Sequence, residues 1–128
     1  MTTATPTKTQ RPETYTDGLG LTLLAHRRYL GLSQPEMADA IGMSLHSYKR
    51  IETNRRPCPP GLFDTVIERV IEFDAALDAT LEYWETDPPG DTATIAADNT
   101  PVQRAALMRA CVEYGATTPI IIGEENAD

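Results

Sequence analysis

Residues 31–57 read GLSQPEMADAIGMSLHSYKRIETNRRP, and this stretch decides the fold. Ser33 stands three residues before Glu36, which predicts a capping box at the start of a short helix. Gly42 is placed to end that helix, because glycine adopts the positive φ of a tight turn most easily. Ser44 then provides a capping hydroxyl for a second short helix. The stretch therefore predicts two short helices joined by a tight turn.

The positions at which these two helices would touch are small or apolar. Ala38 is small at the expected crossing point, where a larger side chain would force the helices apart. Met37 is expected on the buried side of the first helix, with Ala38. The contacts that fix the second helix at a steep angle are expected from Ile41, Met43, Tyr48 and Ile51. With the two caps, this pattern predicts a helix-turn-helix, a unit that can place its second helix in the major groove of DNA.

The residues before this stretch divide into a leader and a helix. Residues 1–17 are rich in Thr and Pro and have no apolar periodicity, which predicts a disordered leader. A helix is expected over residues 18–30, with Gly31 as its C-cap. Its apolar residues at helical spacing are Leu21, Leu24, Ala25 and Leu30.

A long amphipathic segment follows the motif. It runs from about Gly61 to Thr86, and an apolar stripe recurs every seven residues. The stripe consists of Phe63, Val70, Leu77 and Trp84. The opposite face is acidic. This pattern predicts either one long helix or two helices with a bend near Asp74, and the Pro- and Gly-containing residues 88–91 read as a linker.

The chain after the linker predicts a small mixed unit. A short strand is expected over residues 92–96, a helix from about Thr100 to Gly115, and a second strand over residues 119–122. The unit is too short for a large core of its own, so it is expected to pack on the long helix or on a second copy. Dimer contacts are expected from Leu107, Ile120, Ile121 and Ile122.

The expected fold class is therefore mainly α. A helix-turn-helix bundle is followed by a long helix and a small α/β C-terminal dimerisation unit. The expected divisions are a leader at 1–17, a DNA-binding helical domain at 18–87, a linker at 88–91 and a dimerisation segment at 92–128.

The formal net charge of -8 conceals a polarised chain. Residues 18–60 carry six basic side chains against three carboxylates, whereas residues 61–91 carry one arginine against nine carboxylates. DNA responds to the local field of one face rather than to the total charge. The basic segment is therefore compatible with a nucleic-acid partner, and the acidic face either is solvated or receives a basic protein.

The motif resembles the lambda-repressor/Cro-like helix-turn-helix family over about Leu21 to Val70. The resemblance implies that Gln34 binds a phosphate and that the loop residues Arg55 and Arg56 grip the DNA backbone. It also implies that bases are read near the start of the second motif helix, the recognition helix. These positions are Leu45, His46, Lys49 and Arg50.

The residues themselves support these roles. The four base-reading positions share one exposed face of the recognition helix. Arg50 can fork onto guanine O6 and N7, and Leu45 can touch a thymine methyl where the family often has a polar residue. Ser44 and Ser47 lie in the first turn of that helix and are expected at phosphates. Asn54 replaces the family's usual glycine and can also adopt the left-handed conformation.

Structural or solvent-exposed roles, rather than DNA contacts, are also considered for several residues in and near the motif. Glu52 is expected to be a structural ion-pair partner of an arginine, and Tyr48 to be a core residue. Arg27 and Arg28 are either solvated, salt-bridged or in contact with phosphate. His46 is either a base reader or an ordinary surface histidine.

A narrower resemblance links the chain to small phage or mobile-element repressors, including those encoded beside anti-CRISPR genes. It rests on Tyr48, on the run NRRPCPPG at 54–61 and on the short C-terminal unit. It implies a C-terminal dimerisation element and a protein that silences its own operon.

Other classes of function find little support in the sequence. Cys58 and Cys111 have no metal-like spacing with each other or with the histidines, and no catalytic constellation or phosphate-cradling glycine loop is visible. We therefore expect no enzyme, no metal and no cofactor. No apolar run approaches the ~20 residues of a membrane span, and without a secretory signal the expected location is the cytoplasm.

The expected function is that of a dimeric regulator that binds double-stranded DNA at an inverted repeat and blocks a promoter. Two alternatives stay open. One is an antitoxin whose helix-turn-helix autoregulates while the acidic C-terminal region neutralises a toxin. The other is a protein-interaction adaptor that has lost DNA binding.

Overall fold

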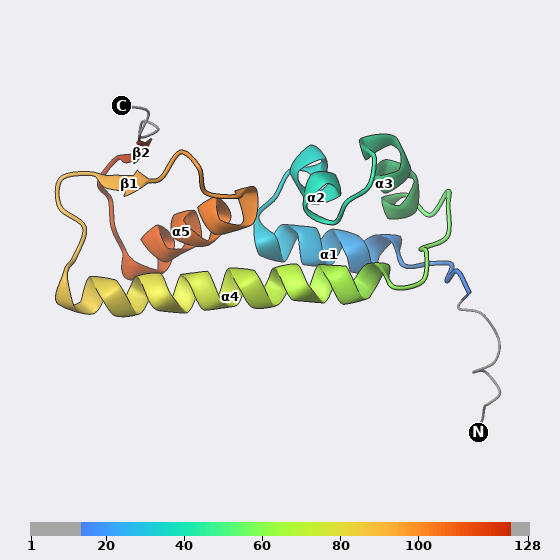
Figure 1. The fold of residues 1–128 in the computed structure, drawn as a ribbon, viewed down its shortest axis with the longest axis horizontal. Helices are drawn as coiled ribbons and strands as arrows, with labels where there is room; N and C mark the ends of the chain where they lie inside the picture. Colours follow the sequence, from blue (N-terminus) through green and yellow to red (C-terminus); the bar gives the residue numbers. More distant parts are fainter. Residues whose placement is uncertain (1–13, 124–128) are drawn as a thin grey trace, which may run out of the picture.

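The computed structural model describes residues 14–123 of the 128-residue chain. Five helices and two short strands follow one another along this part of the chain (Figure 1). They are α1 Gly20–Leu30, α2 Gln34–Ala40, α3 Leu45–Glu52, α4 Leu62–Thr86, β1 Ala93–Ile95, α5 Pro101–Tyr114 and β2 Ile120–Ile122. The protein is mainly α, with a helix-turn-helix, a long helix and a small α/β C-terminal part, as the sequence predicted.

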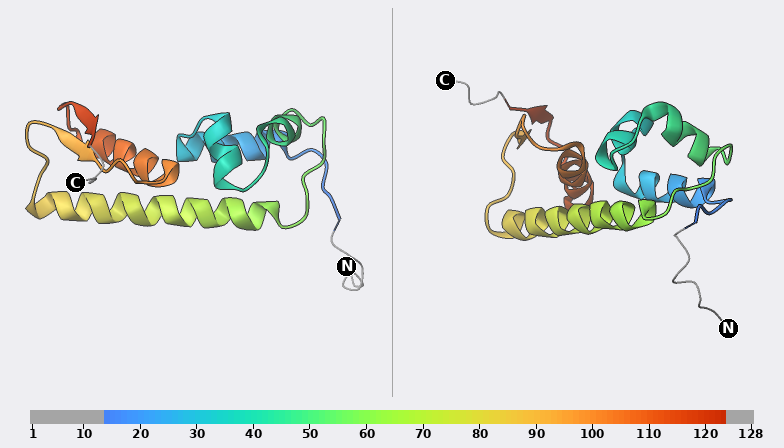
Figure 2. Two further views of the ribbon diagram at one scale, coloured as in Figure 1. Left: turned by 45° about the horizontal axis from the view of Figure 1, so that its top comes forward. Right: turned by 45° about the vertical axis from the view of Figure 1, so that its right-hand side comes forward.

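The long helix α4 forms the base of the molecule. It continues through Asp74 as one helix of 25 residues, so the alternative of two helices is excluded. Helices α1, α2 and α3 lie along its first half, and α5 with the two strands lies along its second half (Figures 1 and 2). Because both halves rest on one helix, the orientation of the helix-turn-helix relative to the C-terminal part is set by α4.

One hydrophobic core runs through both halves. It begins with Leu23 of α1 and Tyr48 of α3, continues through Phe73 and Trp84 of α4, and reaches Ala106 of α5. Helix α5 packs along α4 and buries three small residues in this core. They are Ala105, Ala106 and Ala110. The C-terminal unit was predicted to pack on the long helix or on a second copy, and the structure shows it packed on the long helix.

The predicted caps and turn of the motif are confirmed. The Ser33 hydroxyl accepts a hydrogen bond from the Glu36 backbone N–H at 3.2 Å, and the Ser33 N–H donates to the Glu36 carboxylate at 2.9 Å. Gly42 has φ of +77° in the turn between α2 and α3. Ser44 caps α3 by accepting from the Ser47 N–H at 3.1 Å.

The predicted apolar face of α1 is partly wrong. Leu21 is 74% exposed, whereas Leu23, which was not among the predicted apolar residues, is fully buried. Leu23 and Leu30 are seven residues apart, which places them on the same side of α1, in the core of the bundle. The run Leu-Thr-Leu-Leu offers more than one helical stripe, and the packing of α1 on its neighbours selects among them.

Residues 1–13 of the predicted leader lie outside the described residues. The prediction needs correction for residues 14–17, which the structure describes. Thr16 forms an antiparallel bridge with Cys58, with backbone hydrogen bonds of 2.9 and 2.8 Å. This bridge holds the entry to α1 against the loop that precedes α4. Residues near Thr16 are therefore part of the fold rather than of a free leader.

The strands β1 and β2 form a parallel pair joined by α5 as the crossover helix (Figure 1). Ala93 of β1 is paired with Ile120 of β2, and Ile95 with Ile122. The two β1 residues are buried, whereas all three β2 isoleucines are exposed. Within residues 14–123, no helix combines the length and the apolar character needed to cross a membrane.

Candidate nucleic-acid interface

The recognition helix α3 has one buried and one exposed face. Tyr48 and Ile51 are buried in the core of the bundle. His46, Lys49 and Arg50 are exposed on the outside. Leu45, at the first position of the helix, is half-buried. Three of the four predicted base readers are therefore freely presented, and the fourth lies at the edge of the core.

Helix α3 lies on the surface of the bundle, away from α4. In Figures 1 and 2, α1 lies between α3 and α4, and the C-terminal strands lie at the far end of the molecule. The acidic face that the sequence placed on α4 is thus separated from the exposed side of α3 by a helix. A ligand that approaches α3 meets the basic segment of the chain first.

The loop after α3 folds back onto the end of that helix. The backbone N–H groups of Arg55 and Arg56 both donate to the carbonyl of Arg50, at 2.8 and 3.1 Å. Asn54 makes this reversal with φ of +62°, as the sequence predicted. The loop therefore presents its basic side chains at a fixed place beside the recognition helix.

Two of the predicted phosphate contacts meet directly. The Arg56 guanidinium donates from Nη1 to the Ser47 hydroxyl oxygen at 2.7 Å. Arg55 is exposed, whereas Arg56 is half-buried. Arg56 and Ser47 thus form one polar pair at the side of α3, whereas Arg55 projects from the loop by itself.

Gln34 occupies the first position of α2, where the free N–H groups of a helix start favour an anion. Its side-chain nitrogen donates to the Glu52 carboxylate at 2.8 Å. An amide nitrogen has two hydrogens, so one remains for a phosphate oxygen. Ser44 similarly uses its hydroxyl oxygen as the cap of α3 and keeps its O–H hydrogen.

The carboxylate of Glu52 connects the three helices of the motif. It receives two hydrogen bonds from Arg27 of α1, at 2.8 and 3.2 Å, and one from Gln34 of α2. The Tyr48 hydroxyl of α3 donates a fourth at 2.6 Å. The Glu52 side chain is only 6% exposed. The predicted structural ion pair of Glu52 is confirmed, and Arg27 is its partner.

These contacts also shift the titration of the groups involved. Burial by itself would raise the pKa of Glu52, but the donors on Arg27, Tyr48 and Gln34 outweigh burial and lower it. Burial and the hydrogen bond to Glu52 raise the pKa of Tyr48. The hydrogen bond to Glu52 raises the pKa of Arg27. Glu52 is therefore charged and Tyr48 neutral at neutral pH, which keeps every donor and acceptor in the cluster matched.

The charge at the exposed side of α3 is uncompensated. Among residues 14–123, Arg27, Arg69 and Arg109 form ion pairs with carboxylates. The basic side chains on and after α3 form none with the described residues; they are Lys49, Arg50, Arg55 and Arg56. Four cations on one helix and its following loop are suited to contact a polyanion.

Comparison with protein families matches residues 19–83 to the helix-turn-helix domain. The chain belongs to the helix-turn-helix domain family. The matched residues begin one residue before α1 and continue through most of α4, so they include the complete motif and the helix on which it rests. This family indicates a DNA-binding regulator. A search of curated proteins found no match to the chain.

Sequence reasoning missed a close contact that holds the helix-turn-helix domain together. The backbone N–H of Gly20 donates to the Asn54 side-chain oxygen at 2.8 Å. A Cβ atom on Gly20 would lie 2.3 Å from the carbonyl oxygen of Glu52. The start of α1 therefore touches the end of α3, and the signal in the sequence was the glycine at position 20, where a side chain would not fit.

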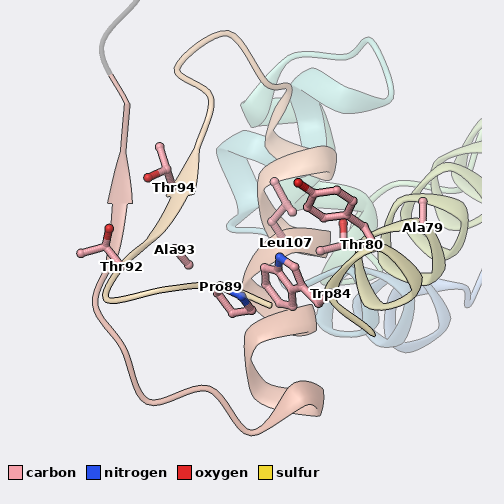
Figure 3. A pocket seen from close by; sticks show the side chains of 9 residues that line it. Ala79, Thr80, Trp84, Pro89, Thr92, Ala93, Thr94 and Leu107 are labelled. Atoms are coloured by element: carbon pink, nitrogen blue, oxygen red, sulfur yellow. The ribbon is translucent and has the colours of Figure 1, made fainter. Parts of the chain in front are cut away.

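The four residues predicted to form a dimer contact differ in their surroundings. Leu107 of α5 is half-buried and lines a cavity of about 360 Å³ with Trp84 and Ala93 (Figure 3). It thus packs within its own chain. Ile120, Ile121 and Ile122 are between 41% and 53% exposed. The three isoleucines are exposed enough to contact a partner, whereas much of the Leu107 side chain is covered by its own chain.

Proposed function

We propose that the protein is a transcriptional repressor that binds a specific double-stranded DNA sequence as a homodimer. The observation that carries the proposal is the exposed side of α3. This side presents Lys49 and Arg50, and the loop with Arg55 is held beside it by backbone hydrogen bonds. Such an arrangement offers side chains for base edges and for the phosphate backbone at the same time.

Base reading is assigned to the outer side of α3. Arg50 is long enough to donate two hydrogen bonds to one guanine, and Lys49 can reach the same groove edge. His46 lies one turn earlier on the exposed face. Leu45 is half-buried, so its exposed part is suited to an apolar contact such as a thymine methyl.

Phosphate binding is assigned to groups at both ends of the motif. Gln34 and Ser44 stand at helix starts and each keeps a hydrogen for an anion. Ser47 and Arg56, which are joined by a hydrogen bond, would act as one phosphate contact, and Arg55 as another. Contacts to phosphate position the protein, and they make binding strongly dependent on salt.

Action as a dimer on an inverted repeat is proposed because a single recognition helix offers few side chains for base reading. One recognition helix makes few base contacts, so proteins of this kind read two half-sites about one helical turn apart. A bound dimer would block access to a promoter without any catalytic step. The similarity to small phage and mobile-element repressors supports a role in silencing its own operon, in the cytoplasm of a bacterium or an infected cell.

An antitoxin role is the second candidate, and the exposed side of α4 favours it. Ile67 and Ile71 are 45% and 62% exposed, and the exposed carboxylates Asp64 and Glu68 lie beside them. A basic protein with an apolar centre would fit this surface. A stable one-to-one complex with such a protein, encoded beside the gene, would support the antitoxin.

The proposed function is tested by selecting DNA from a random pool of duplexes with the full chain. We expect an enriched inverted repeat and an affinity that falls steeply as salt is raised. The matched control is a Lys49→Ala, Arg50→Ala double variant, which should retain the fold but enrich no sequence. A wild-type chain that enriches no sequence and shows no salt-dependent binding would instead indicate the adaptor role.

A further inference from the structure

The strand β2 is an edge strand, and nothing in its three residues prevents it from pairing with a further strand. Within residues 14–123, β2 pairs with β1 alone. It consists of three isoleucines with no charged residue. An edge strand of a monomer usually carries a charge, a proline or a bulge that prevents further pairing. The exposed edge of β2 carries none of these over its three residues.

The register of the sheet determines which backbone groups face outward. The Pro119 carbonyl accepts from the Ala93 N–H at 2.8 Å, and the Gly123 N–H donates to the Ile95 carbonyl at 2.8 Å. Both residues thus turn their polar groups toward β1. Backbone polar groups alternate along a strand, so Ile121 also faces β1. Ile120 and Ile122 therefore direct their N–H and C=O groups toward the free edge.

The side chains of β2 divide between the two faces of the sheet. Ile120 and Ile122 share a face with their register partners Ala93 and Ile95, which are buried. This face also borders a groove of about 330 Å³ that Ile120 lines with Met108 and Val112. Val112 is 75% exposed. The apolar surface thus continues from β2 onto α5.

We infer that β2 pairs antiparallel with β2 of a second copy about a two-fold axis at Ile121. This inference rests on the dimer of the proposed function and assigns its contact. Ile120 would exchange two backbone hydrogen bonds with the partner's Ile122, and Ile122 would do the same with the partner's Ile120. Ile121 would then lie opposite the partner's Ile121, with Cα atoms about 4.5 Å apart.

The free backbone groups fit this arrangement. An antiparallel pair alternates between residues that exchange two hydrogen bonds and residues that exchange none. Ile120 and Ile122 direct their polar groups outward and Ile121 does not, so a centre at Ile121 satisfies all four outward groups on each copy. The result is a four-stranded sheet in which no outward-facing group of Ile120 or Ile122 is left without a partner.

The exposed apolar surface beside β2 favours a second copy as the occupant of this edge. Met108 and Val112 of α5 are 50% and 75% exposed, and Ile120 and Ile122 of β2 are 41% and 53% exposed. A two-fold axis perpendicular to the sheet keeps α5 of both copies on the same face, so this surface of one copy would lie beside the same surface of the other.

The test uses point substitutions in the full chain, because removal of α5 would uncover the core face of α4. Ile121→Glu places two carboxylates opposite each other at the axis, where they repel. Ile121→Lys does the same with two ammonium groups. The matched control is Thr94→Glu, which adds the same charge to the same outer face at the register partner of Ile121, away from the axis. The molar mass of each protein is measured by light scattering.

We expect twice the chain mass for the wild type and for Thr94→Glu, and the mass of one chain for each Ile121 variant. An equimolar mixture of Ile121→Glu and Ile121→Lys should return to twice the chain mass, because opposite charges then meet at the axis. Only a contact of residue 121 with itself gives this rescue. A monomeric wild type, or a dimer that survives Ile121→Glu, would overturn the inference.

DNA binding is measured on the same proteins to separate this inference from the proposed function. Ile121→Glu should bind a duplex with the selected inverted repeat about 100-fold more weakly than wild type, because the second half-site no longer adds to the first. It should bind a duplex with one half-site as the wild type does. A wild type that dimerises but binds neither duplex would refute the proposed function and leave the interface standing.

Discussion

The carboxylate of Glu52 accepts two hydrogen bonds from the guanidinium of Arg27, at 2.8 and 3.2 Å, and this pair joins the recognition helix to the first helix of the bundle. The same carboxylate orients Gln34, a predicted phosphate contact. The angle of α3 and the position of the Gln34 side chain therefore depend on one carboxylate. Changes at this pair should affect stability and DNA binding together.

Arg27→Ala should lower the free energy of unfolding by about 3 kcal/mol, because it leaves the buried carboxylate of Glu52 without its cation. Denaturation by urea measures the change. Arg28→Ala is the matched control, since Arg28 is exposed and makes no ion pair with the described residues. It should change stability by less than about 0.5 kcal/mol. Equal effects of the two substitutions would show that the Arg27–Glu52 pair contributes nothing to stability.

The lowered pKa of Glu52 predicts a loss of stability in acid. Its pKa is lower in the folded state than the value of about 4.3 expected for an unfolded chain. Its contribution is therefore complete above pH of about 4.3 and is lost as the pH falls through the lower pKa of the folded protein. Other carboxylates titrate in the same range, so the comparison requires a variant.

Glu52→Gln keeps the size of the side chain and cannot ionise. The difference in unfolding free energy between wild type and Glu52→Gln should favour the wild type at neutral pH and shrink as the pH falls below about 4.3. Urea denaturation at a series of pH values measures it. A difference that stays constant over this range would contradict the lowered pKa.

Gly20→Ala should destabilise the protein and weaken DNA binding. The added Cβ would meet backbone and side-chain oxygens at the end of α3, at 2.3 Å for Glu52 and 2.8 Å for Asn54. Overpacking of this kind costs about 1–3 kcal/mol, and relief requires α1 and α3 to separate. Gly90→Ala is the control, because no atom lies within 4 Å of its Cβ position. Thermal melts and DNA titrations of both variants decide the matter, and a normal melt for Gly20→Ala would exclude the contact.

The helix-turn-helix was predictable because its signals are local. The caps at Ser33 and Ser44 and the turn at Gly42 involve only residues a few positions away in the sequence. These features can therefore be predicted without knowledge of the tertiary structure. The exposure of His46, Lys49 and Arg50 on one side of α3 follows from the same local pattern. The resemblance to a known family added the predicted roles of individual positions.

Contacts between distant segments were not predictable in the same way. The choice of Leu23 over Leu21 as the buried residue of α1 depends on where α3 and α4 lie. The hydrogen bond from Gly20 to Asn54 joins residues 34 positions apart. The Thr16–Cys58 bridge similarly orders residues that the composition alone assigned to a leader. Each of these contacts depends on which distant segments pack together, and the pattern of neighbouring residues does not show this.

Arg50 and Arg55 should have different effects on DNA binding, although both are exposed arginines within five residues of each other. Arg50 lies on the outer face of α3, where a guanidinium can fork onto a guanine. Arg50→Ala should weaken binding to the selected site by about 1–3 kcal/mol and relax the preference at one base pair. Binding to unrelated DNA should change less, because few base contacts form there.

Arg55 projects from the loop after α3 and is assigned to a phosphate. Arg55→Ala should weaken binding to all sequences about equally and make the slope of affinity against salt shallower by about one unit. Competition titrations with the selected and unrelated duplexes, repeated at several salt concentrations, measure both properties for both variants. The two arginines serve as controls for each other, since the substitutions remove the same charge from neighbouring positions. An unchanged sequence preference in Arg50→Ala would remove Arg50 from the base readers, and an unchanged salt slope in Arg55→Ala would remove Arg55 from the phosphate contacts.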